Sequence, residues 1–442
     1  MRRLLRRFIP KSALAAYHGL VARAGAAVFR HPSRRLTVIG ITGTSGKTTV
    51  GILLQAILER ADIPSALASS AVFAVRNRQA VNDTKMTMLG RWRLQRFLRS
   101  ALKAGCTHVI VETTSEGLAQ NRHLGIDYDV AALTNLSPEH LESHGSFAAY
   151  QSAKERLFHI LTLTARKPGV PKVIVVNADD EAAPSFLRHA ADKYVTFTLQ
   201  GTTHAQAESV TATSIKLSPA GSTFVLTANS GSARVELGLL GRMNVENALA
   251  ASAVAYALGL PVETIADGLG TVRAIPGRLE FFRAGGVTVI VDYAFHPKAM
   301  EELYAVVESL PHRNILHVLG GTGGGRDRAR RPVLGRIAGE RAQTVIVTNE
   351  DPYDEDPYSI MDDVLSGVIE IGDKHLGENV FRILDRRAAI AQAVTLAHDG
   401  DVILVTGKGS EQAIVVGGGK KVPWDDREVV KACLTERFGE IQ

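Results

Sequence analysis

The stretch Gly40-Ile-Thr-Gly-Thr-Ser-Gly-Lys-Thr-Thr49 lies between an apolar run typical of a buried strand and a stretch typical of a helix. Glycines in such a loop let backbone N–H groups turn inward on phosphate oxygens, and the helix N-terminus adds partial positive charge. Lys47 is placed to reach the β- and γ-phosphates, and the Thr48 hydroxyl to ligate a metal ion. The pattern predicts a phosphate loop in variant form, because Ile41 stands where the strict pattern has glycine. The residues expected to bind the nucleotide here are Gly43, Thr44, Ser45, Gly46, Lys47, Thr48 and Thr49.

Around this loop, short β-branched runs alternate with longer helical stretches. Strands separated by helices predict a parallel sheet in an α/β fold. The expected strands are 36–41, 108–112, 129–136 and 172–180. From about Tyr194 to Leu240 the sequence instead alternates apolar and polar residues, which predicts a small antiparallel insert before a helix that begins near Asn244.

A second α/β region follows a segment with Pro and Gly at 273–278, which is typical of a linker. Its expected strands are 287–293, 314–320, 344–350 and 401–407. We therefore predict three parts: a basic amphipathic N-terminal segment, a central ATP-binding domain and a C-terminal Rossmann-like domain. Their boundaries are 1–35, 36–274 and 275–442.

The overall composition limits the class of protein. A chain of 442 residues is too long for one ordinary core, and its net charge of +6 is not arranged as the basic stripe of a nucleic-acid binder. Nucleic acid is therefore not an expected partner, and we expect a monomer. Two cysteines, Cys106 and Cys433, form neither a metal pattern nor a disulfide framework, which favours the cytoplasm.

The N-terminus is basic, with four arginines among the first seven residues. Leu14, Tyr17, Val21 and Ala24 recur at helical spacing, which predicts an amphipathic helix. No run of about 18 apolar residues indicates a membrane span. Two hypotheses stay open: a helix packed on the protein's own surface, which we favour, or peripheral membrane contact through residues 1–30.

A phosphate loop alone indicates a nucleotide but no reaction. A GTPase needs a base-reading Asn-Lys-x-Asp sequence after a later strand. The nearest candidates, 177–180 and 348–351, both lack the lysine. The sequence therefore argues against a GTPase.

An ordered set of motifs extends from Leu36 to the C-terminus. In order, they are TGTSGKTT (42–49), VETTSEGL (111–118), TNLSPEHLESHG (134–145), YQSAKERLF (150–158), NADD (177–180), GRMNVENALAA (241–251), PGRLE (276–280), VDYAFHP (291–297), GRDRARRPVLG (325–335), TNEDPYDEDP (348–357), GKGSE (407–411) and WDDREVV (424–430). Together they resemble the Mur ligase family, and most closely its MurE branch.

The resemblance implies an enzyme that uses ATP and Mg²⁺ to form an amide bond. Such a ligase transfers the γ-phosphoryl group to a substrate carboxylate, and an amine then attacks the acyl phosphate. Thr48 and Glu112 are then expected to hold one Mg²⁺, and His140 a second. Lys154 matches the lysine that this family carbamoylates, which makes it a further expected ligand in the metal site.

Further nucleotide contacts are implied by the same resemblance. Asn244 and Asn247 lie one helical turn apart, so one helix face can offer both amides to the adenine and ribose. Arg278 matches the linker arginine that reaches the γ-phosphate, and Asp292 the acid that binds the ribose hydroxyls. The expected catalytic residues are Lys47, Lys154, His140 and Arg278.

The expected acceptor site comprises Ser115, Gln120 and Arg122, which match positions that the MurE branch uses on the muramoyl-peptide. A guanidinium such as that of Arg122 pairs well with a peptide carboxylate. About 40 residues precede the phosphate loop, so the usual UDP-binding domain is expected to be missing. The acceptor is therefore left open between a UDP-linked, a lipid-linked and a free peptide.

The expected amino-acid site departs from the family pattern. Diaminopimelate enzymes have Asp-Asn-Pro-Arg, where this chain has Glu350-Asp351-Pro352-Tyr353, and Glu411 is expected nearby. The acidic pair suggests a cationic amino-acid side chain, although the sequence does not identify the amino acid. Another departure is Phe295, which replaces a histidine of the family.

The favoured hypothesis is therefore an ATP-dependent ligase that adds an amino acid to a peptidoglycan-precursor-like peptide in the cytoplasm, with membrane association left open. One alternative is a Mur-like ligase acting on a poly-amino acid or another substrate without UDP. The other is a non-catalytic nucleotide-binding subunit that serves a partner.

Overall fold

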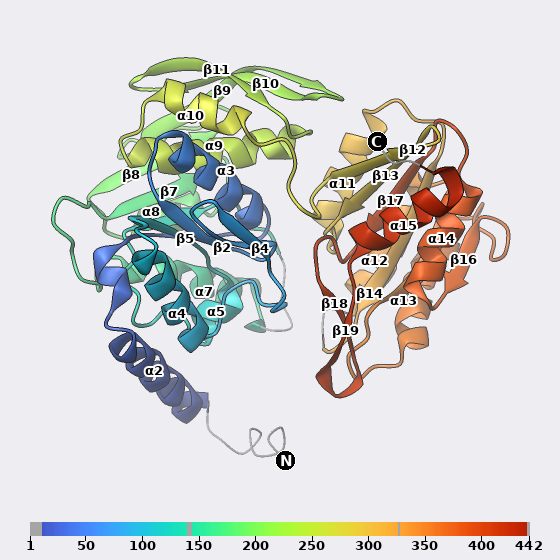
Figure 1. Cartoon of the computed structure of the whole chain (residues 1–442), viewed down its shortest axis with the longest axis horizontal. Coiled ribbons are helices and arrows are strands. Elements are labelled where there is room, and N and C mark those ends of the chain that lie inside the picture. Colours follow the sequence, from blue (N-terminus) through green and yellow to red (C-terminus); the bar gives the residue numbers. More distant parts are fainter. Residues whose placement is uncertain (1–10, 139–143, 326–327, 440–442) are drawn as a thin grey trace. The chain divides into compact units, whose positions relative to one another are not determined.

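The computed structural model describes residues 11–138, 144–325 and 328–439, which form two compact units (Figure 1). The first unit includes most of the chain up to Arg273. The second begins at Ala274 and also includes the short pieces 83–85 and 218–220. Each unit has its own sheet and its own hydrophobic core.

The first unit is built on an eleven-stranded sheet in the order β11-β10-β9-β8-β7-β6-β1-β5-β2-β3-β4. The strand that leads into the phosphate loop, β1, lies between β5 and β6 and runs parallel to both. The strands are β1 (Thr37–Thr42), β2 (Ser65–Ala68), β3 (Val72–Val75), β4 (Arg78–Val81), β5 (His108–Glu112), β6 (Val130–Leu133), β7 (Val173–Asn177), β8 (Lys193–Thr198), β9 (Glu208–Ser218), β10 (Gly221–Ala228) and β11 (Gly231–Leu237).

The predicted α/β fold is confirmed, but two details of this sheet differ from the prediction. The alternating stretch after Tyr194 was expected to be antiparallel throughout, whereas β8 pairs in parallel with β7 and β9 in parallel with β8. The pair β10–β11 is antiparallel, as predicted, and it extends the same sheet. On the opposite edge, β2, β3 and β4 form antiparallel pairs that the sequence did not predict.

Helices cover both faces of the first sheet (Figure 1). One face carries α3, α9 and α10, which contact one another, and the other carries α4, α5, α7 and α8. The helices of this unit are α2 (Lys11–Val28), the 3₁₀ turn η1 (Pro32–Arg35), α3 (Lys47–Arg60), α4 (Arg91–Lys103), α5 (Ser115–Ala119), α7 (Phe147–Ile160), α8 (Ala183–Leu187), α9 (Arg242–Ala257) and α10 (Val262–Gly270).

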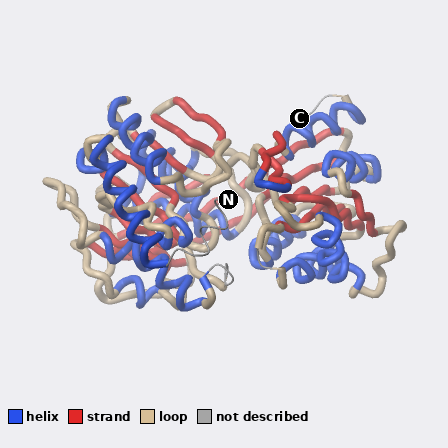
Figure 2. Tube along the Cα trace, turned by 90° about the horizontal axis from the view of Figure 1, so that it is seen from below, coloured by secondary structure: helices blue, strands red, loops and turns tan. Residues whose placement is uncertain are grey.

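The second unit has a six-stranded sheet in the order β12-β13-β17-β14-β15-β16, with helices on both sides (Figure 2). Only β12 runs antiparallel to its neighbour. The strands are β12 (Glu280–Ala284), β13 (Val287–Asp292), β14 (Ile315–Thr322), β15 (Thr344–Asp351), β16 (Val380–Ile383) and β17 (Val402–Thr406), with a separate hairpin of β18 (Ala413–Val416) and β19 (Lys420–Pro423). The helices are α11 (Pro297–Glu308), α12 (Arg330–Arg341), α13 (Pro357–Ile369), α14 (Arg386–Leu396), α15 (Asp426–Phe438) and the 3₁₀ turn η2 (Gly417–Gly419).

Close packing at Gly40 fixes α7 against the central strand. A Cβ atom at Gly40 would lie 2.8 Å from the Leu157 side chain and 2.9 Å from that of Tyr128, closer than packed atoms come. Glycine therefore lets α7 approach β1 directly. Since Lys154 lies about one turn before Leu157 on the same helix, this contact places Lys154 beside the loop that follows β1.

A buried charge network joins the amino ends of β1, β6 and β7. The Asp129 carboxylate accepts a hydrogen bond from the Val38 N–H at 2.8 Å and forms ion pairs with Lys167 and Lys172. Lys172 Nζ also donates to the Tyr128 carbonyl oxygen at 2.5 Å. The network holds the strands in register at the sheet end opposite the phosphate loop.

Replacing Asp129 by Asn should therefore destabilise the protein by about 3–5 kcal/mol, because two buried ammonium groups would lose their counter-charge. Urea denaturation measures this change. Glu236→Gln is a suitable control, since Glu236 forms an ion pair with Arg234 that is largely exposed, and no measurable change is expected. A D129N protein that unfolds at the wild-type urea concentration would contradict the assigned role.

Candidate functional site

The phosphate loop is shaped by two glycines that no other residue could replace. Gly43 has φ +152° and Gly46 has φ +79°, in the region that side chains disfavour. A Cβ at Gly43 would lie 1.8 Å from Thr134 Oγ1, and one at Gly46 would lie 2.1 Å from Asn247 Oδ1. The loop is thus enclosed by the end of β6 on one side and by α9 on the other.

Backbone and side-chain bonds hold the loop in place. The Thr44 N–H donates to the Asn135 carbonyl oxygen at 2.9 Å, and the Ser45 N–H to Asn135 Oδ1 at 3.0 Å. Lys47 Nζ donates to the carbonyl oxygens of Gly43 and Thr44, both at 2.9 Å. The Lys47 ammonium therefore lies over the loop, where it can meet a phosphate.

Thr48 and Glu112, the two residues predicted to hold one Mg²⁺, are in contact. Glu112 ends β5, and its Oε2 accepts hydrogen bonds from Thr48 Oγ1 at 3.0 Å and from the Ser70 N–H at 2.7 Å. The Ser70 hydroxyl lies 2.7 Å from that of Thr48. A carboxylate and two hydroxyls are hard oxygen donors, so this group fits Mg²⁺. Ser70 was missed because it follows β2, a strand that the sequence analysis did not identify.

Lys154 is buried against the other side of the loop. Its Nζ donates to the Gly43 carbonyl oxygen at 2.7 Å and lies 4.4 Å from the centre of the Tyr150 ring. The Tyr150 hydroxyl is 3.1 Å from Thr44 Oγ1. The structure therefore brings Lys154 to the phosphate loop, as a role in the metal site requires. In the described part of the chain, no three or more Asp, Glu, His or Cys residues are arranged so that they could hold a metal ion by themselves.

His140, predicted to ligate a second Mg²⁺, lies outside the described residues. His144, four residues further along the chain, lies within them. Its Nε2 is 3.1 Å from Ser115 Oγ, and its ring packs against that of Tyr150. Burial lowers the pKa of His144, and the positive charges of Lys154 and Arg156 lower it further against the opposing effect of Glu116. His144 is therefore a neutral hydrogen-bonding partner for Ser115 near pH 7.

The predicted acceptor residues gather around α5. The Arg122 guanidinium donates to Gln120 Oε1 at 2.8 Å and to the Met88 carbonyl oxygen at 2.5 Å. Arg91 was not predicted, yet it donates to the Gln120 carbonyl oxygen. Burial, and then the charge of Arg122, lower the pKa of Arg91. Two arginines held this close favour an anionic ligand.

The amide pair predicted to face adenine and ribose lies on α9. Asn244 Nδ2 donates to the Leu240 carbonyl oxygen at 2.8 Å, and Asn247 Nδ2 donates to Asn244 Oδ1 at 3.2 Å. As the clash at Gly46 shows, Asn247 touches the phosphate loop. The structure thus places Asn247 at the loop itself and Asn244 behind it.

Arg278 and Asp292 belong to the second unit. The Arg278 guanidinium lies 4.4 Å from the centre of the Tyr293 ring and donates to the Gly277 carbonyl oxygen at 2.9 Å. Asp292 accepts the backbone N–H groups of Leu279 and Ala294, each at 2.7 Å. Burial raises the pKa of Asp292, although Arg278 opposes the shift. Both residues therefore hold the 275–280 turn against the end of β13.

The acidic residues predicted to select the amino acid already have a cation among them. Lys408 Nζ donates to Asp351 Oδ1 at 2.9 Å and to Glu411 Oε2 at 2.7 Å. Burial works against the charge of Lys408, but Glu411, Asp351 and Glu350 raise its pKa overall. Glu350 Oε1 accepts the Thr322 hydroxyl at 2.6 Å. The Lys408 ammonium offsets the negative charge of these carboxylates. They do not by themselves predict a cationic amino-acid substrate.

Tyr353 occupies the position where diaminopimelate enzymes have arginine. Its backbone is left-handed, with φ 53°, and its N–H donates to the Val415 carbonyl oxygen at 3.0 Å. A Cβ at Gly324 would lie 2.8 Å from the Tyr353 side chain. Tyr353 is thus fixed between the end of β15 and β18.

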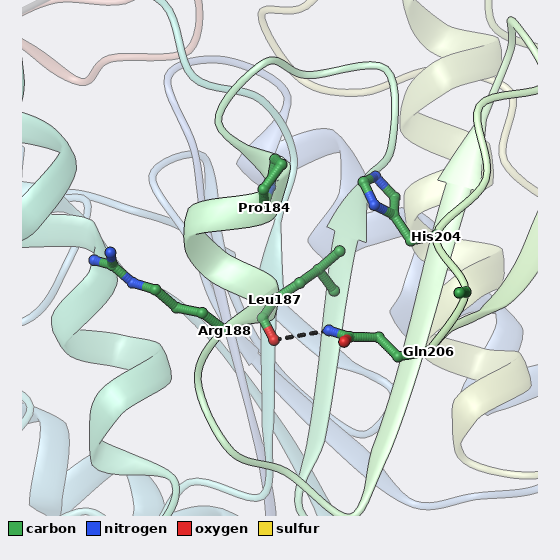
Figure 3. Close-up of a pocket in the computed structure, with 6 residues that line it drawn as sticks. Pro184, Leu187, Arg188, His204 and Gln206 are labelled. Atoms are coloured by element: carbon green, nitrogen blue, oxygen red, sulfur yellow. Dashed lines mark hydrogen bonds between the residues drawn. The ribbon is translucent and has the colours of Figure 1, made fainter.

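A cavity of about 450 Å³ lies apart from these residues, beside α8 (Figure 3). It is lined by Pro184, Leu187, Arg188, His204, Ala205 and Gln206. Gln206 Nε2 donates across it to the Leu187 carbonyl oxygen at 3.0 Å. The cavity includes none of the predicted site residues, and we assign it no catalytic role.

A phosphate loop after a central parallel strand, with oxygen donors converging beside it, defines a P-loop nucleotide-binding enzyme of the α/β class. The chain matches the Mur ligase middle domain over residues 41–255 and the Mur ligase, glutamate ligase domain over residues 277–409. It belongs to the Mur ligase family and is an ATP-dependent ligase, which confirms the resemblance that the motifs indicated.

Its relatives include named enzymes of the MurE type. A UDP-N-acetylmuramyl-tripeptide synthetase of Roseiflexus sp. (strain RS-1) is 37% identical over 97% of this chain and 84% of that protein. A UDP-N-acetylmuramoyl-L-alanyl-D-glutamate–2,6-diaminopimelate ligase of Geobacillus kaustophilus is 36% identical over 93% of this chain and 81% of that protein. A solved structure of a UDP-N-acetylmuramoyl-L-alanyl-D-glutamate–2,6-diaminopimelate ligase has a TM-score of 0.62 and 30% identity, over 95% of this chain and 83% of that one.

Substituting Ala for Gly43 should abolish measurable ATP binding, because the new methyl group would displace Thr134 and open the loop. Isothermal titration calorimetry with ATP and Mg²⁺ tests this. Gly372→Ala is the matched control, since a Cβ at Gly372 meets nothing within 4 Å. Equal ATP affinity of the two variants would show that the nucleotide binds elsewhere.

Proposed function

We propose that this ligase activates a carboxylate of a peptide-bearing cell-wall precursor with ATP and joins it to the amine of an amino acid. The observation that supports this most is the meeting of Thr48, Glu112 and Ser70 on one side of the phosphate loop with Lys154 on the other. The relatives named as tripeptide synthetase and diaminopimelate ligase support a precursor peptide as the acceptor.

The proposed reaction has two steps. A carboxylate oxygen of the acceptor attacks the γ-phosphorus of ATP, and ADP leaves, giving an acyl phosphate. The amine then attacks the acyl carbon, phosphate leaves, and the amine loses one proton as the amide forms. Mg²⁺, when bound, neutralises the phosphate charge that would otherwise repel the carboxylate.

Each residue of the loop region has a role in this scheme. The Lys47 ammonium stabilises the negative charge of the β- and γ-phosphates. Thr48 and Glu112 supply oxygen ligands of the metal. Arg122 and Arg91 bind an acceptor carboxylate and hold it for attack. The roles of Arg278 and Asp292 toward the nucleotide, and of His140 toward a second Mg²⁺, stay predictions from the resemblance.

The ligase should release phosphate from ATP only when both an acceptor and a suitable amino acid are present. The assay measures phosphate release for a panel of amino acids against three acceptors: a UDP-linked muramoyl dipeptide, a lipid-linked muramoyl dipeptide and the free dipeptide. Mass spectrometry of the product identifies the pair that is joined. Phosphate release that does not depend on any amine would refute the ligase hypothesis. ATP binding without phosphate release under any condition would favour the hypothesis of a non-catalytic nucleotide-binding subunit.

Carbamoylation of Lys154 gives a second test. Removing its side chain in Lys154→Ala should lower activity at least on the order of 100-fold, because the metal site loses a supporting negative group. A short-chain carboxylic acid should restore part of that activity, since it can occupy the place of the carbamate. Lys216→Ala, on the exposed end of β9, should behave as wild type with or without the acid. Full activity of K154A would exclude the carbamate role.

A further inference from the structure

Helix α2 packs on the first unit through small residues. Its inner face carries Gly19, Ala22, Gly25 and Ala26, which are buried against α4 and the 124–125 turn. A Cβ at Gly25 would be 3.8 Å from Gln95 and 3.9 Å from the Trp92 ring. One face of α2 therefore packs against the first unit, and the opposite face is exposed.

The exposed side of α2 is apolar. Tyr17, Leu20 and Val28 are 61%, 68% and 63% exposed, and Ala24 and Ala27 lie between them on the same face. These positions repeat at helical spacing, so the side chains form one continuous stripe. Single exposed apolar residues are ordinary, but a stripe that extends from Tyr17 to Val28 indicates a contact surface.

Basic side chains and a tryptophan of α4 border this stripe. Trp92 is 45% exposed and packs edge-on against Phe29, which directly follows α2. Arg93 and Arg96 follow Trp92 on α4 and are exposed, as is Lys103 at the end of this helix. We call this surface the α2–α4 face; it comprises Tyr17, Leu20, Ala24, Ala27, Val28, Trp92, Arg93, Arg96 and Lys103.

Neither α2 nor α4 contributes a carboxylate to the α2–α4 face. The chain contains no Asp or Glu before Glu59, and none from Thr84 to Val111, so both helices and the loops that flank them lack acidic residues. Arg23 and Arg30 add exposed positive charge beside the apolar stripe. An apolar stripe with basic borders is the arrangement that anionic lipid surfaces bind.

We propose that the α2–α4 face docks on a membrane surface that contains anionic phospholipid. The apolar stripe and Trp92 enter the boundary between headgroups and acyl chains, and the basic side chains contact lipid phosphates. Among the described residues, no helix is long and apolar enough to cross a membrane. A second copy of the chain fits this face poorly, because two uncompensated positive surfaces repel each other.

This docking surface lies in the first unit and involves no residue of the phosphate loop, so it is independent of the proposed function. Its failure would leave the ligase intact, and a failure of the ligase assay would leave the docking intact. If both hold, the enzyme works within reach of acceptors that are anchored in the membrane.

Vesicle co-sedimentation with the full chain tests the proposal directly. The protein should pellet with vesicles of phosphatidylcholine and phosphatidylglycerol in equal parts, and should stay in solution with phosphatidylcholine alone. Raising the salt concentration should weaken the binding, because screening acts on the lysine and arginine contacts. Equal binding to both vesicle types, or no binding to either, would overturn the proposal.

Two variants with matched controls locate the contact. The triple variant R93Q/R96Q/K103Q should bind anionic vesicles on the order of 100-fold more weakly, since each basic residue contributes separately. The double variant L20S/V28S should lose about tenfold or more, because it removes the apolar stripe without changing charge. The controls are Arg234→Gln on β11 and Leu163→Ser, whose side chains are exposed elsewhere on the first unit.

Trp92 provides an independent measurement. In a Trp424→Phe background it is the sole tryptophan, and its emission should shift to shorter wavelength when anionic vesicles are added. Circular dichroism and ATP binding establish that each variant is folded. Unchanged emission, or control variants that lose binding as strongly as the α2–α4 variants, would exclude this face. So would a dimer in light scattering that L20S/V28S abolishes without any vesicle binding.

Discussion

Close packing around the phosphate loop is the constraint on which the first unit depends. Gly43 and Gly46 leave no room for a Cβ, because Thr134 at the end of β6 and Asn247 on α9 fill that space. The loop, the neighbouring strand and the helix behind it are therefore fixed with respect to one another. A site that must align phosphate, metal and carboxylate needs such a rigid support, since small displacements are costly in catalysis.

The lysines of the two units have different partners. Lys47 and Lys154 both donate to the Gly43 carbonyl oxygen, so both side chains lie beside the phosphate loop. Lys172 and Lys408 are held by buried carboxylates, and removing those contacts would leave an uncompensated charge. The ion pairs of Lys172 and Lys408 therefore stabilise the fold.

In the second unit, a buried lysine changes how the nearby acidic residues are interpreted. Glu350, Asp351 and Glu411 look like a site for a cationic substrate when they are considered one by one. With Lys408 among them, they form a network that holds the end of β15 and the turn before β18. The charge of these residues therefore does not by itself indicate which amino acid the ligase uses.

The sequence alone determined β1, the phosphate loop and α3, because the apolar run, the glycines and the Lys-Thr pair are contiguous and each acts locally. It also predicted that Glu112 ends a strand, and the family resemblance implied that Glu112 lies beside the loop. Only the tertiary structure decided the direction of β8, the β3–β4 hairpin and the partners Ser70, His144 and Lys408. These features depend on residues far apart in the chain, and an alternating pattern carries no information about which neighbour a strand pairs with, or in which direction.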